Sequence, residues 1–189
     1  MKNIFILHSL NGDTLKIWGM DVKETFKDID VYMPEFPIRA ESRYVKFKEI
    51  LGNYLENGIL NSDSIVIGHS IGNAYFVRFC LEYNFVPKAY VAVAPGGVYD
   101  YPTTRTDYIV DVKKQAYASK ESLEFVKNMK CKKYCLYSDE DDHNPEKFER
   151  FIEDTNCEGI YLKGYNHFDG YHRIYKIPEL IELITELVK

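Results

Sequence analysis

Short apolar runs, rich in isoleucine, valine, phenylalanine and tyrosine, recur along the chain and predict the strands of a sheet. They are nearly continuous rather than alternating with polar residues, which is typical of strands buried on both faces. There are six of these runs, at Asn3–Leu7, Asp30–Met33, Ser64–Ile67, Ala89–Ala94, Lys133–Tyr137 and Gly159–Leu162.

Helical periodicity occupies most of the intervals between and after these runs. Pro145 and Pro178 suit the first turn of a helix, where the missing N–H costs nothing. Alternating strands and helices imply βαβ crossovers, and hence an α/β fold with a mostly parallel sheet and helices on both faces. The predicted helices are Lys16–Lys27, Ser42–Glu56, Ile71–Tyr83, Lys120–Met129, Pro145–Thr155 and Pro178–Val188.

Length and charge narrow the function classes. The chain has 189 residues and a net charge of −5, which predicts a single domain over residues 1–189. An acidic chain without a basic stripe is a poor partner for nucleic acid. The apolar run at the start is too short for a signal peptide, and no run approaches the length that spans a membrane. We therefore expect a cytoplasmic protein that does not partner a membrane.

The four cysteines fall within or directly beside predicted strands or helices and lack C-x-x-C spacing. Reduced thiols in a cytosolic protein are the favoured interpretation, with a disulfide or a zinc site as the alternative. We expect no metal and no cofactor. The cysteines are Cys80, Cys131, Cys135 and Cys157.

The stretch Gly68-His69-Ser70-Ile71-Gly72 joins a predicted strand to a predicted helix with almost no residues left for a loop. So sharp a turn strains the central residue and crowds the backbones two positions to either side, where glycine removes the clashing Cβ atoms. The Ser70 hydroxyl is then exposed at a helix N-terminus, which favours developing negative charge. A chance G-x-S-x-G is the alternative, but the flanking strand and helix favour a nucleophile.

A serine nucleophile needs a base to take its proton and a carboxylate to orient that base. A sharp strand-to-helix turn that carries a nucleophile is called a nucleophile elbow. In enzymes with such an elbow the catalytic residues follow one another along the chain in the order Ser, then Asp or Glu, then His. His167 follows the last predicted strand and fits the base, whereas His143 lies inside the acidic loop and His172 lies further from its strand. Asp141 fits the acid, with Asp142 as the alternative. The other two histidines precede or flank the nucleophile.

The acidic loop Asp139–Asp142 has two further interpretations, a solvated turn and a calcium site. It begins like an EF-hand loop. However, it lacks the expected glycine, and its twelfth position is Arg150 rather than glutamate. A triad acid therefore remains the preferred interpretation of this loop.

Acyl chemistry also needs two N–H donors for the oxyanion of the tetrahedral intermediate. One should be Ile71, immediately after the nucleophile. The other should come from the loop after the first strand, most plausibly from Leu10.

Together these residues resemble the small, single-domain serine hydrolases that include retinoblastoma-binding protein 9 and the bacterial YdeN-like proteins. The similarity spans essentially the whole chain, through IFILHSLNG, GHSIGN, SDEDDHNP and GYNHFD. It implies a compact α/β-hydrolase fold of about six strands without a large cap domain. Ser138, Asp141 and Pro145 match the acid motif of that family.

The chain departs from the family pattern at two positions. The family's base motif is commonly Gly-His-Phe, and Asn166-His167-Phe168 keeps only its last two residues. Ser9 stands where the family often has glycine, and its side chain is expected to affect the loop that presents Leu10. Trp18 resembles an aromatic position of the family just beyond that loop, with a plain core role as the alternative.

The resemblance implies a serine hydrolase that acts on small esters, amides or thioesters through an acyl-enzyme. Acyl transfer and thioester cleavage use the same triad, so the residues do not separate them from carboxylesterase action. The alternative is a non-catalytic interaction scaffold that retains the fold. Retinoblastoma-type binding uses Leu-x-Cys-x-Glu; Arg78-Phe79-Cys80-Leu81-Glu82 lacks the leucine and lies in a predicted buried helix, which argues against that partner.

The interval between the predicted strands at Ala94 and Lys133 limits the size of any lid. One crossover helix uses its last part, and the rest is too short for a large helical cap. A shallow pocket for short acyl groups is therefore expected. Tyr99, Tyr101 and Tyr108 could wall it, with ordinary surface packing as the alternative.

Overall fold

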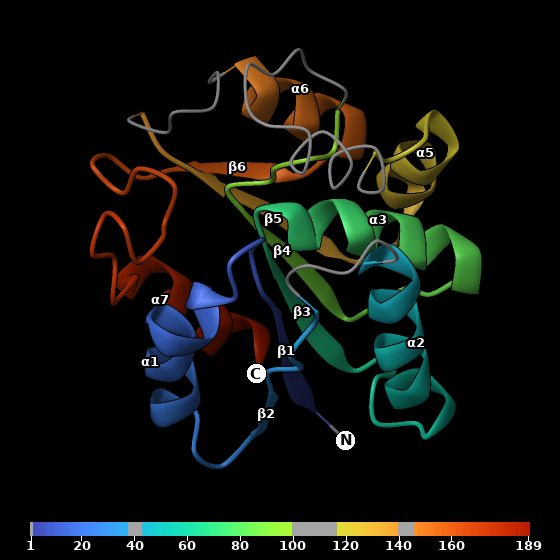
Figure 1. The fold of residues 1–189 in the computed structure, drawn as a ribbon, viewed down its shortest axis with the longest axis horizontal. Coiled ribbons are helices and arrows are strands. Elements are labelled where there is room, and N and C mark those ends of the chain that lie inside the picture. The colour runs from blue at the N-terminus through green and yellow to red at the C-terminus, as the bar shows by residue number, and fades with distance from the viewer. Residues whose placement is uncertain (1, 38–42, 100–116, 140–145) are drawn as a thin grey trace.

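Six parallel strands form one sheet, in the order β2-β1-β3-β4-β5-β6 (Figure 1). The computed structural model describes residues 2–37, 43–99, 117–139 and 146–189. The strands are β1 (Asn3–Leu7), β2 (Asp30–Tyr32), β3 (Ser64–His69), β4 (Ala89–Val93), β5 (Lys132–Tyr137) and β6 (Glu158–Tyr161).

Helices cover both faces of the sheet. Helices α2, α3 and α5 lie on one face, α1 and α7 lie on the other, and α6 lies beside β6 (Figure 1). A short 3-10 helix precedes α1. The bounds are η1 (Asp13–Lys16), α1 (Trp18–Thr25), α2 (Arg43–Glu56), α3 (Ile71–Tyr83), α5 (Lys120–Asn128), α6 (Glu146–Thr155) and α7 (Pro178–Leu187).

Each central strand divides its side chains between two hydrophobic cores because successive residues point to opposite faces. In β1, Phe5 and Leu7 join the core under α2, α3 and α5, whereas Ile4 and Ile6 join the core under α1 and α7. Every residue of β1, β3 and β4 is buried, as the continuous apolar runs predicted.

The two edge strands differ from the prediction of burial on both faces. Strands β2 and β6 are partly exposed, because each has a neighbouring strand on one side only. The predicted helix Lys16–Lys27 is also different: the chain forms η1 first, and the non-helical backbone of Ile17 (φ −116°, ψ −124°) separates it from α1. Pro178 occupies the first turn of α7, as predicted.

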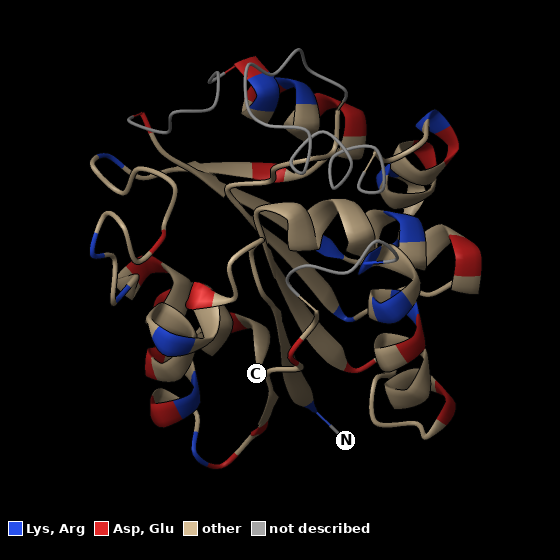
Figure 2. Ribbon diagram, viewed as in Figure 1, with Lys and Arg blue, Asp and Glu red and all other residues tan. Residues whose placement is uncertain are grey.

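Lysine and arginine are interspersed with acidic residues along the outer helices, whereas most of α3 carries no charge (Figure 2). All four cysteines are free thiols, and three of them are buried; Cys131 is partly buried. Within the described residues, no helix combines the length and apolar character needed to cross a bilayer, and no three potential metal ligands cluster.

Most of the predicted functional residues follow the carboxyl ends of the strands. The chain runs from β1 outward to β2, and then returns to β3 and continues through β4, β5 and β6. The order therefore reverses between β1 and β3, and ligands of open α/β sheets bind outside the carboxyl ends of the strands at such a point. The loop after β1 and Ser70, directly after β3, both lie there.

Candidate active site

Ser70 occupies a strained turn between β3 and α3. Its φ of 52° and ψ of −122° lie outside the regions that residues with a Cβ prefer. A Cβ on Gly72 would lie 2.7 Å from the carbonyl oxygen of Leu7 and 2.9 Å from that of His8, and a Cβ on Gly68 would overlap the side chain of Asn73. The two flanking glycines are thus required by close packing, as predicted.

The side chain of Asn73, a residue of helix α3, stabilises this turn through hydrogen bonds. Its Nδ2 donates to the carbonyls of Ser70 (3.1 Å) and Val93 (3.2 Å), and its Oδ1 accepts from the hydroxyl of Tyr90 (2.9 Å). Asn73 and Tyr90 are both fully buried. The backbone of Gly96 adds a third contact, since its N–H donates to the carbonyl of Ser70 at 3.1 Å.

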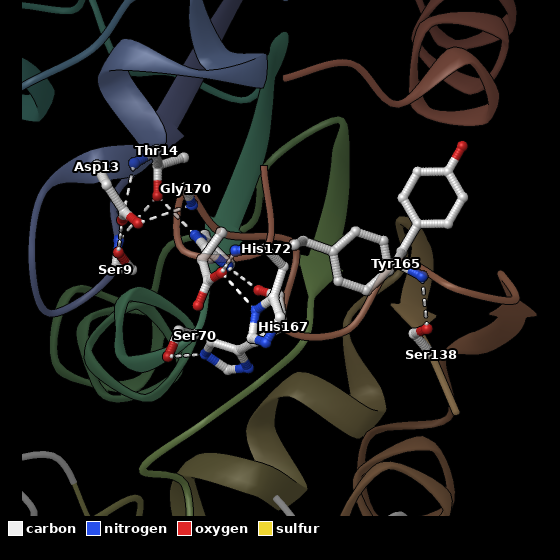
Figure 3. Close-up of polar contacts among 12 residues, drawn as sticks. Ser9, Asp13, Thr14, Ser70, Ser138, Tyr165, His167, Gly170 and His172 are labelled. Carbon is white, nitrogen blue, oxygen red and sulfur yellow. Dashed lines mark hydrogen bonds and ion pairs between the residues drawn. The ribbon is translucent and has the colours of Figure 1, made fainter. Parts of the chain in front are cut away.

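His167 lies beside Ser70 although its loop follows β6, the edge strand on the other side of the sheet. Its Nε2 lies 2.9 Å from Ser70 Oγ (Figure 3). The loop between β6 and α7 carries it back across the sheet. Asn166 and Phe168, on either side of it, have φ values of 50° and 54°. Asn tolerates this left-handed region better than most residues with a Cβ, which explains why it can replace the family's glycine at this position.

Side chains from outside the loop that carries His167 bind its backbone at His167, Phe168 and Gly170. His69 Nε2 lies 2.8 Å from the carbonyl oxygen of His167, and Trp18 Nε1 donates to the carbonyl of Phe168 at 2.9 Å. Asp13 Oδ2 accepts from the N–H of Gly170 at 3.1 Å. Trp18 is also buried in the core, which agrees with the core role given as its alternative.

Ser9 contributes both its side chain and its backbone to the loop after β1. Its hydroxyl donates to Asp13 Oδ1 at 2.6 Å (Figure 3), so the departure from the family's glycine anchors this loop. Its carbonyl oxygen lies 2.6 Å from His8 Nδ1 and 3.2 Å from Arg43 Nη2. Arg43 Nη1 also donates to the carbonyl of Leu10 at 3.1 Å. The peptide between Ser9 and Leu10 is therefore held in one orientation.

Two buried histidines flank the site in the neutral form. Burial lowers the pKa of His69 to about 4, and the charge of His167 acts in the same direction. Thr14 Oγ1 accepts from the N–H of Ser9 (3.2 Å) and donates to His69 Nδ1 (2.5 Å), which leaves the His69 proton on Nε2, facing the carbonyl of His167. Burial also lowers the pKa of His8, whose Nε2 accepts from a backbone N–H at 2.8 Å.

The carboxylate of Asp13 stays ionised although it is partly buried. Burial alone would raise its pKa, but hydrogen bonds from the Ser9 hydroxyl and from the N–H groups of Gly170 and Thr14 outweigh this effect and lower it. Asp13 had no predicted role, because a single acidic residue in a loop carries no recognisable spacing.

Comparison with solved structures identifies the architecture. The ydeN gene product of B. subtilis superposes with a TM-score of 0.80 at 16% identity, over 99% of this chain and 98% of that one. A carboxylesterase structure from the thaumarchaeon Nitrososphaera gargenis superposes with a TM-score of 0.73 at 14% identity, over 99% of this chain and 89% of that one. A protein assigned as a YdeN-like hydrolase from Pectobacterium atrosepticum superposes with a TM-score of 0.71 at 10% identity, over 100% of this chain and 91% of that one. The chain has the α/β-hydrolase fold.

Sequence comparison alone does not reach this conclusion, since no family model and no curated protein matches the chain. Ser70 and His167, the predicted nucleophile and base, are brought together at 2.9 Å, and their catalytic roles stay predictions. The other candidate histidine of the described residues, His172, pairs instead with Asp169, through an Nδ1–Oδ1 distance of 2.7 Å.

The predicted acid Asp141 and its alternative Asp142 lie outside the described residues, as does His143. Ser138 and Asp139, which come just before these acidic residues, form hydrogen bonds with the loop that carries His167. Ser138 Oγ accepts from the N–H of Tyr165 at 3.0 Å (Figure 3), and Asp139 Oδ1 accepts from the N–H of Gly164 at 2.9 Å. The hydrogen bond from Gly164 lowers the pKa of Asp139.

Two cavities lie among the described residues. One of about 330 Å³ lies beside the loop after β1, between Leu15, Met33 and Phe36. The other, of about 390 Å³, lies between α5 and α6 and is lined by Tyr99 and Tyr117. Tyr99 donates to Asp154 there at 2.8 Å and stacks under Arg150, while Tyr101 and Tyr108 lie outside the described residues.

Proposed function

We propose that this protein is a serine hydrolase that cleaves small esters, amides or thioesters through an acyl-enzyme on Ser70. The observation that carries the proposal is the 2.9 Å contact between Ser70 Oγ and His167 Nε2 at a strained elbow. The esterases and hydrolases among the structural neighbours agree with it. No step of the proposed chemistry requires a cofactor.

His167 acts first as a base and then as an acid. Its Nε2 accepts the Ser70 proton while Oγ attacks the substrate carbonyl carbon, which forms a tetrahedral intermediate. The imidazolium then protonates the leaving alcohol, amine or thiol, and an acyl-enzyme remains. His167 next takes a proton from water as the water oxygen attacks the acyl carbonyl carbon, and the imidazolium returns that proton to Ser70 Oγ as the acid leaves.

Two backbone N–H groups stabilise the oxyanion in this proposal. Ile71 is the first residue of α3, so its N–H has no partner within the helix. Leu10 follows the Ser9 carbonyl that His8 and Arg43 hold, and no described residue accepts a hydrogen bond from its N–H. A donor that is already oriented stabilises the transition state without reorganisation.

Asp141 completes the proposed triad as the acceptor for His167 Nδ1–H, with Asp142 as the alternative. The warrant is its position after β5 and the spacing of Ser138, Asp141 and Pro145. Asp141→Asn is expected to lower kcat by about 10⁴-fold, as loss of the orienting carboxylate does in serine proteases. A comparable loss in Asp142→Asn, with Asp141→Asn near wild type, would exchange the two assignments.

Covalent labelling tests the function directly. A fluorophosphonate probe should modify the wild type at Ser70, detected by intact mass and peptide mapping, and leave Ser70→Ala unmodified. Turnover of p-nitrophenyl acetate should fall by ~10³- to 10⁶-fold in Ser70→Ala. A folded wild type that neither reacts with the probe nor hydrolyses the ester would instead support a non-catalytic scaffold.

A further inference from the structure

The loop that carries His167 adopts a conformation that its own sequence does not favour. Asn166 and Phe168 both have left-handed backbones, with φ of 50° and 54°. This region is unfavourable for residues with a Cβ, because the Cβ approaches the following carbonyl. Contacts from outside the loop must therefore stabilise it.

Asp13, Trp18 and His69 supply those contacts at three nearly consecutive residues. They bind the carbonyl of His167 (His69, 2.8 Å), the carbonyl of Phe168 (Trp18, 2.9 Å) and the N–H of Gly170 (Asp13, 3.1 Å). His69 and Trp18 are buried, and Asp13 is partly buried. The bonds join the loop to β3, α1 and η1.

Two of the same side chains also hold the loop after β1. Asp13 Oδ1 accepts from the Ser9 hydroxyl at 2.6 Å, and His69 Nδ1 accepts from Thr14 Oγ1, which itself accepts from the Ser9 N–H (Figure 3). The loop of the base and the loop expected to bind the oxyanion are thus joined through a few buried groups.

We propose that Asp13, Trp18 and His69 form a clasp that fixes the loop of His167 against the loop after β1 and so sets the position of the base relative to Ser70. The clasp binds backbone groups of the loop of His167, so its members are positioning residues. The inference rests on the proposed function, because it assigns the base to His167.

Asp13→Ala removes the carboxylate that joins both loops. A small displacement of a base costs up to about 100-fold in rate, so we expect kcat to fall by ~10- to 100-fold. KM for p-nitrophenyl acetate should change by less than about 3-fold, because the clasp provides no substrate contact. A folded Asp13→Ala protein with wild-type kcat would overturn the proposal.

Trp18→Phe provides a second variant in case Asp13→Ala does not fold. Phenylalanine keeps an aromatic ring in the core, and it loses the N–H that donates to Phe168 together with part of the indole volume. We expect kcat to fall by ~3- to 10-fold with KM unchanged, because a rate change of this size corresponds to the net free energy of one hydrogen bond. Unchanged kcat in the folded variant would exclude Trp18 from the clasp.

Two substitutions of His69 separate positioning from core packing. Gln can donate to the carbonyl of His167, whereas Leu fills the buried site without a donor. Positioning predicts that kcat of His69→Gln exceeds that of His69→Leu by ~5-fold or more. A packing role alone predicts the opposite order, and that order would contradict the proposal.

Asp21→Ala is the matched control. Asp21 lies on α1, near the clasp in sequence, and its partly buried carboxylate pairs at 3.0 Å with the exposed Lys176. Loss of this carboxylate should leave kcat within about 2-fold of wild type, because an ion pair with an exposed lysine contributes little. An equal loss of kcat in Asp21→Ala and Asp13→Ala would attribute the effect to general destabilisation.

Amide hydrogen exchange tests the clasp without activity. The Gly170 N–H should be protected in the wild type and should exchange at least ~10-fold faster in Asp13→Ala. Rapid exchange in the wild type would overturn the clasp even if the fluorophosphonate labels Ser70. Protected exchange in a wild type that the probe does not label would instead overturn the proposed function and retain the clasp as a structural link.

Discussion

The backbone of Gly96 contacts Ser70. A Cβ at this position would lie 3.0 Å from Ser70 Oγ, closer than nearly all such contacts, while the N–H that binds the Ser70 carbonyl would be kept. We therefore expect Gly96→Ala to lower kcat/KM by ~10-fold or more by crowding the attacking oxygen.

Kinetics on p-nitrophenyl acetate, together with thermal unfolding, check this expectation. Gly52→Ala serves as the control, since Gly52 is a buried glycine of α2 whose Cβ would meet the hydroxyl of Tyr83, at the far end of a side chain. It should retain activity. Equal kcat/KM in the two variants would show that the backbone of Gly96 does not confine Ser70 Oγ.

His69 makes stability depend on pH. Its pKa is 6.5 in an unperturbed chain and about 4 in the folded protein, chiefly because of burial. Between these values the unfolded chain binds a proton that the native state does not. The free energy of unfolding contributed by His69 is therefore complete above pH 6.5 and falls by roughly 3 kcal/mol as the pH is lowered to 4.

Urea unfolding at pH 7, 5.5 and 4.5 measures this loss. His69→Gln should flatten the dependence, because glutamine does not titrate. His8, whose pKa burial also lowers, contributes in the same direction to both proteins. Parallel pH profiles for the wild type and His69→Gln would mean that His69 is not the group that titrates.

At the scale of elements, the elbow depends on helix α3 and strand β4 together. Asn73 on α3 binds the carbonyls of Ser70 and Val93, and Tyr90 on β4 satisfies its remaining oxygen. Tyr90→Phe leaves that oxygen buried without a donor, which should cost about 1–3 kcal/mol of stability.

A double-mutant cycle with Asn73→Ala tests this coupling. Tyr90→Phe should destabilise the wild type by at least about 1 kcal/mol more than it destabilises Asn73→Ala, since the acceptor is then already absent. Urea unfolding gives the four free energies. Additive effects would show that the two side chains contribute independently.

The sequence predicted those elements whose signal is local. Strand β1 and helix α3 have the predicted bounds, because hydrophobic periodicity and the Gly-x-Ser-x-Gly corner each lie within a few residues. The contact between Ser70 and His167 was also predicted from the sequence, because both residues come directly after predicted strands and stand in the expected chain order. The clasp did not follow: Asp13 meets Gly170 across 157 positions, and isolated polar loop residues carry no periodicity.

The edge strands illustrate the same limit on prediction. Apolar runs identified β2 and β6, but their exposure depends on which strands pair, and the strand order emerges only in the folded sheet. Ser9 is similar. As a departure from the family pattern it suggested a disturbed loop, whereas the bond to Asp13 makes it an anchor.

At the scale of the whole molecule, the length of the segment between β4 and α5 limits the length of the acyl chain that the protein can bind. Only 26 residues separate the end of β4 at Val93 from the start of α5 at Lys120, so this crossover has no room for a large helical cap. Without a cap, little apolar surface is available to bury a long acyl chain. Each methylene left in water forgoes about 0.8 kcal/mol of binding.

We therefore expect kcat/KM for p-nitrophenyl esters to stop rising beyond an acyl chain of a few carbons. A series from acetate to palmitate, assayed below the micelle-forming concentration of each ester, measures this dependence. Gly96→Ala offers an internal check, because crowding at Ser70 Oγ should lower all members of the series by a similar factor. A steady rise through the long chains would require a deep acyl tunnel, and the proposal of a shallow pocket would then be wrong.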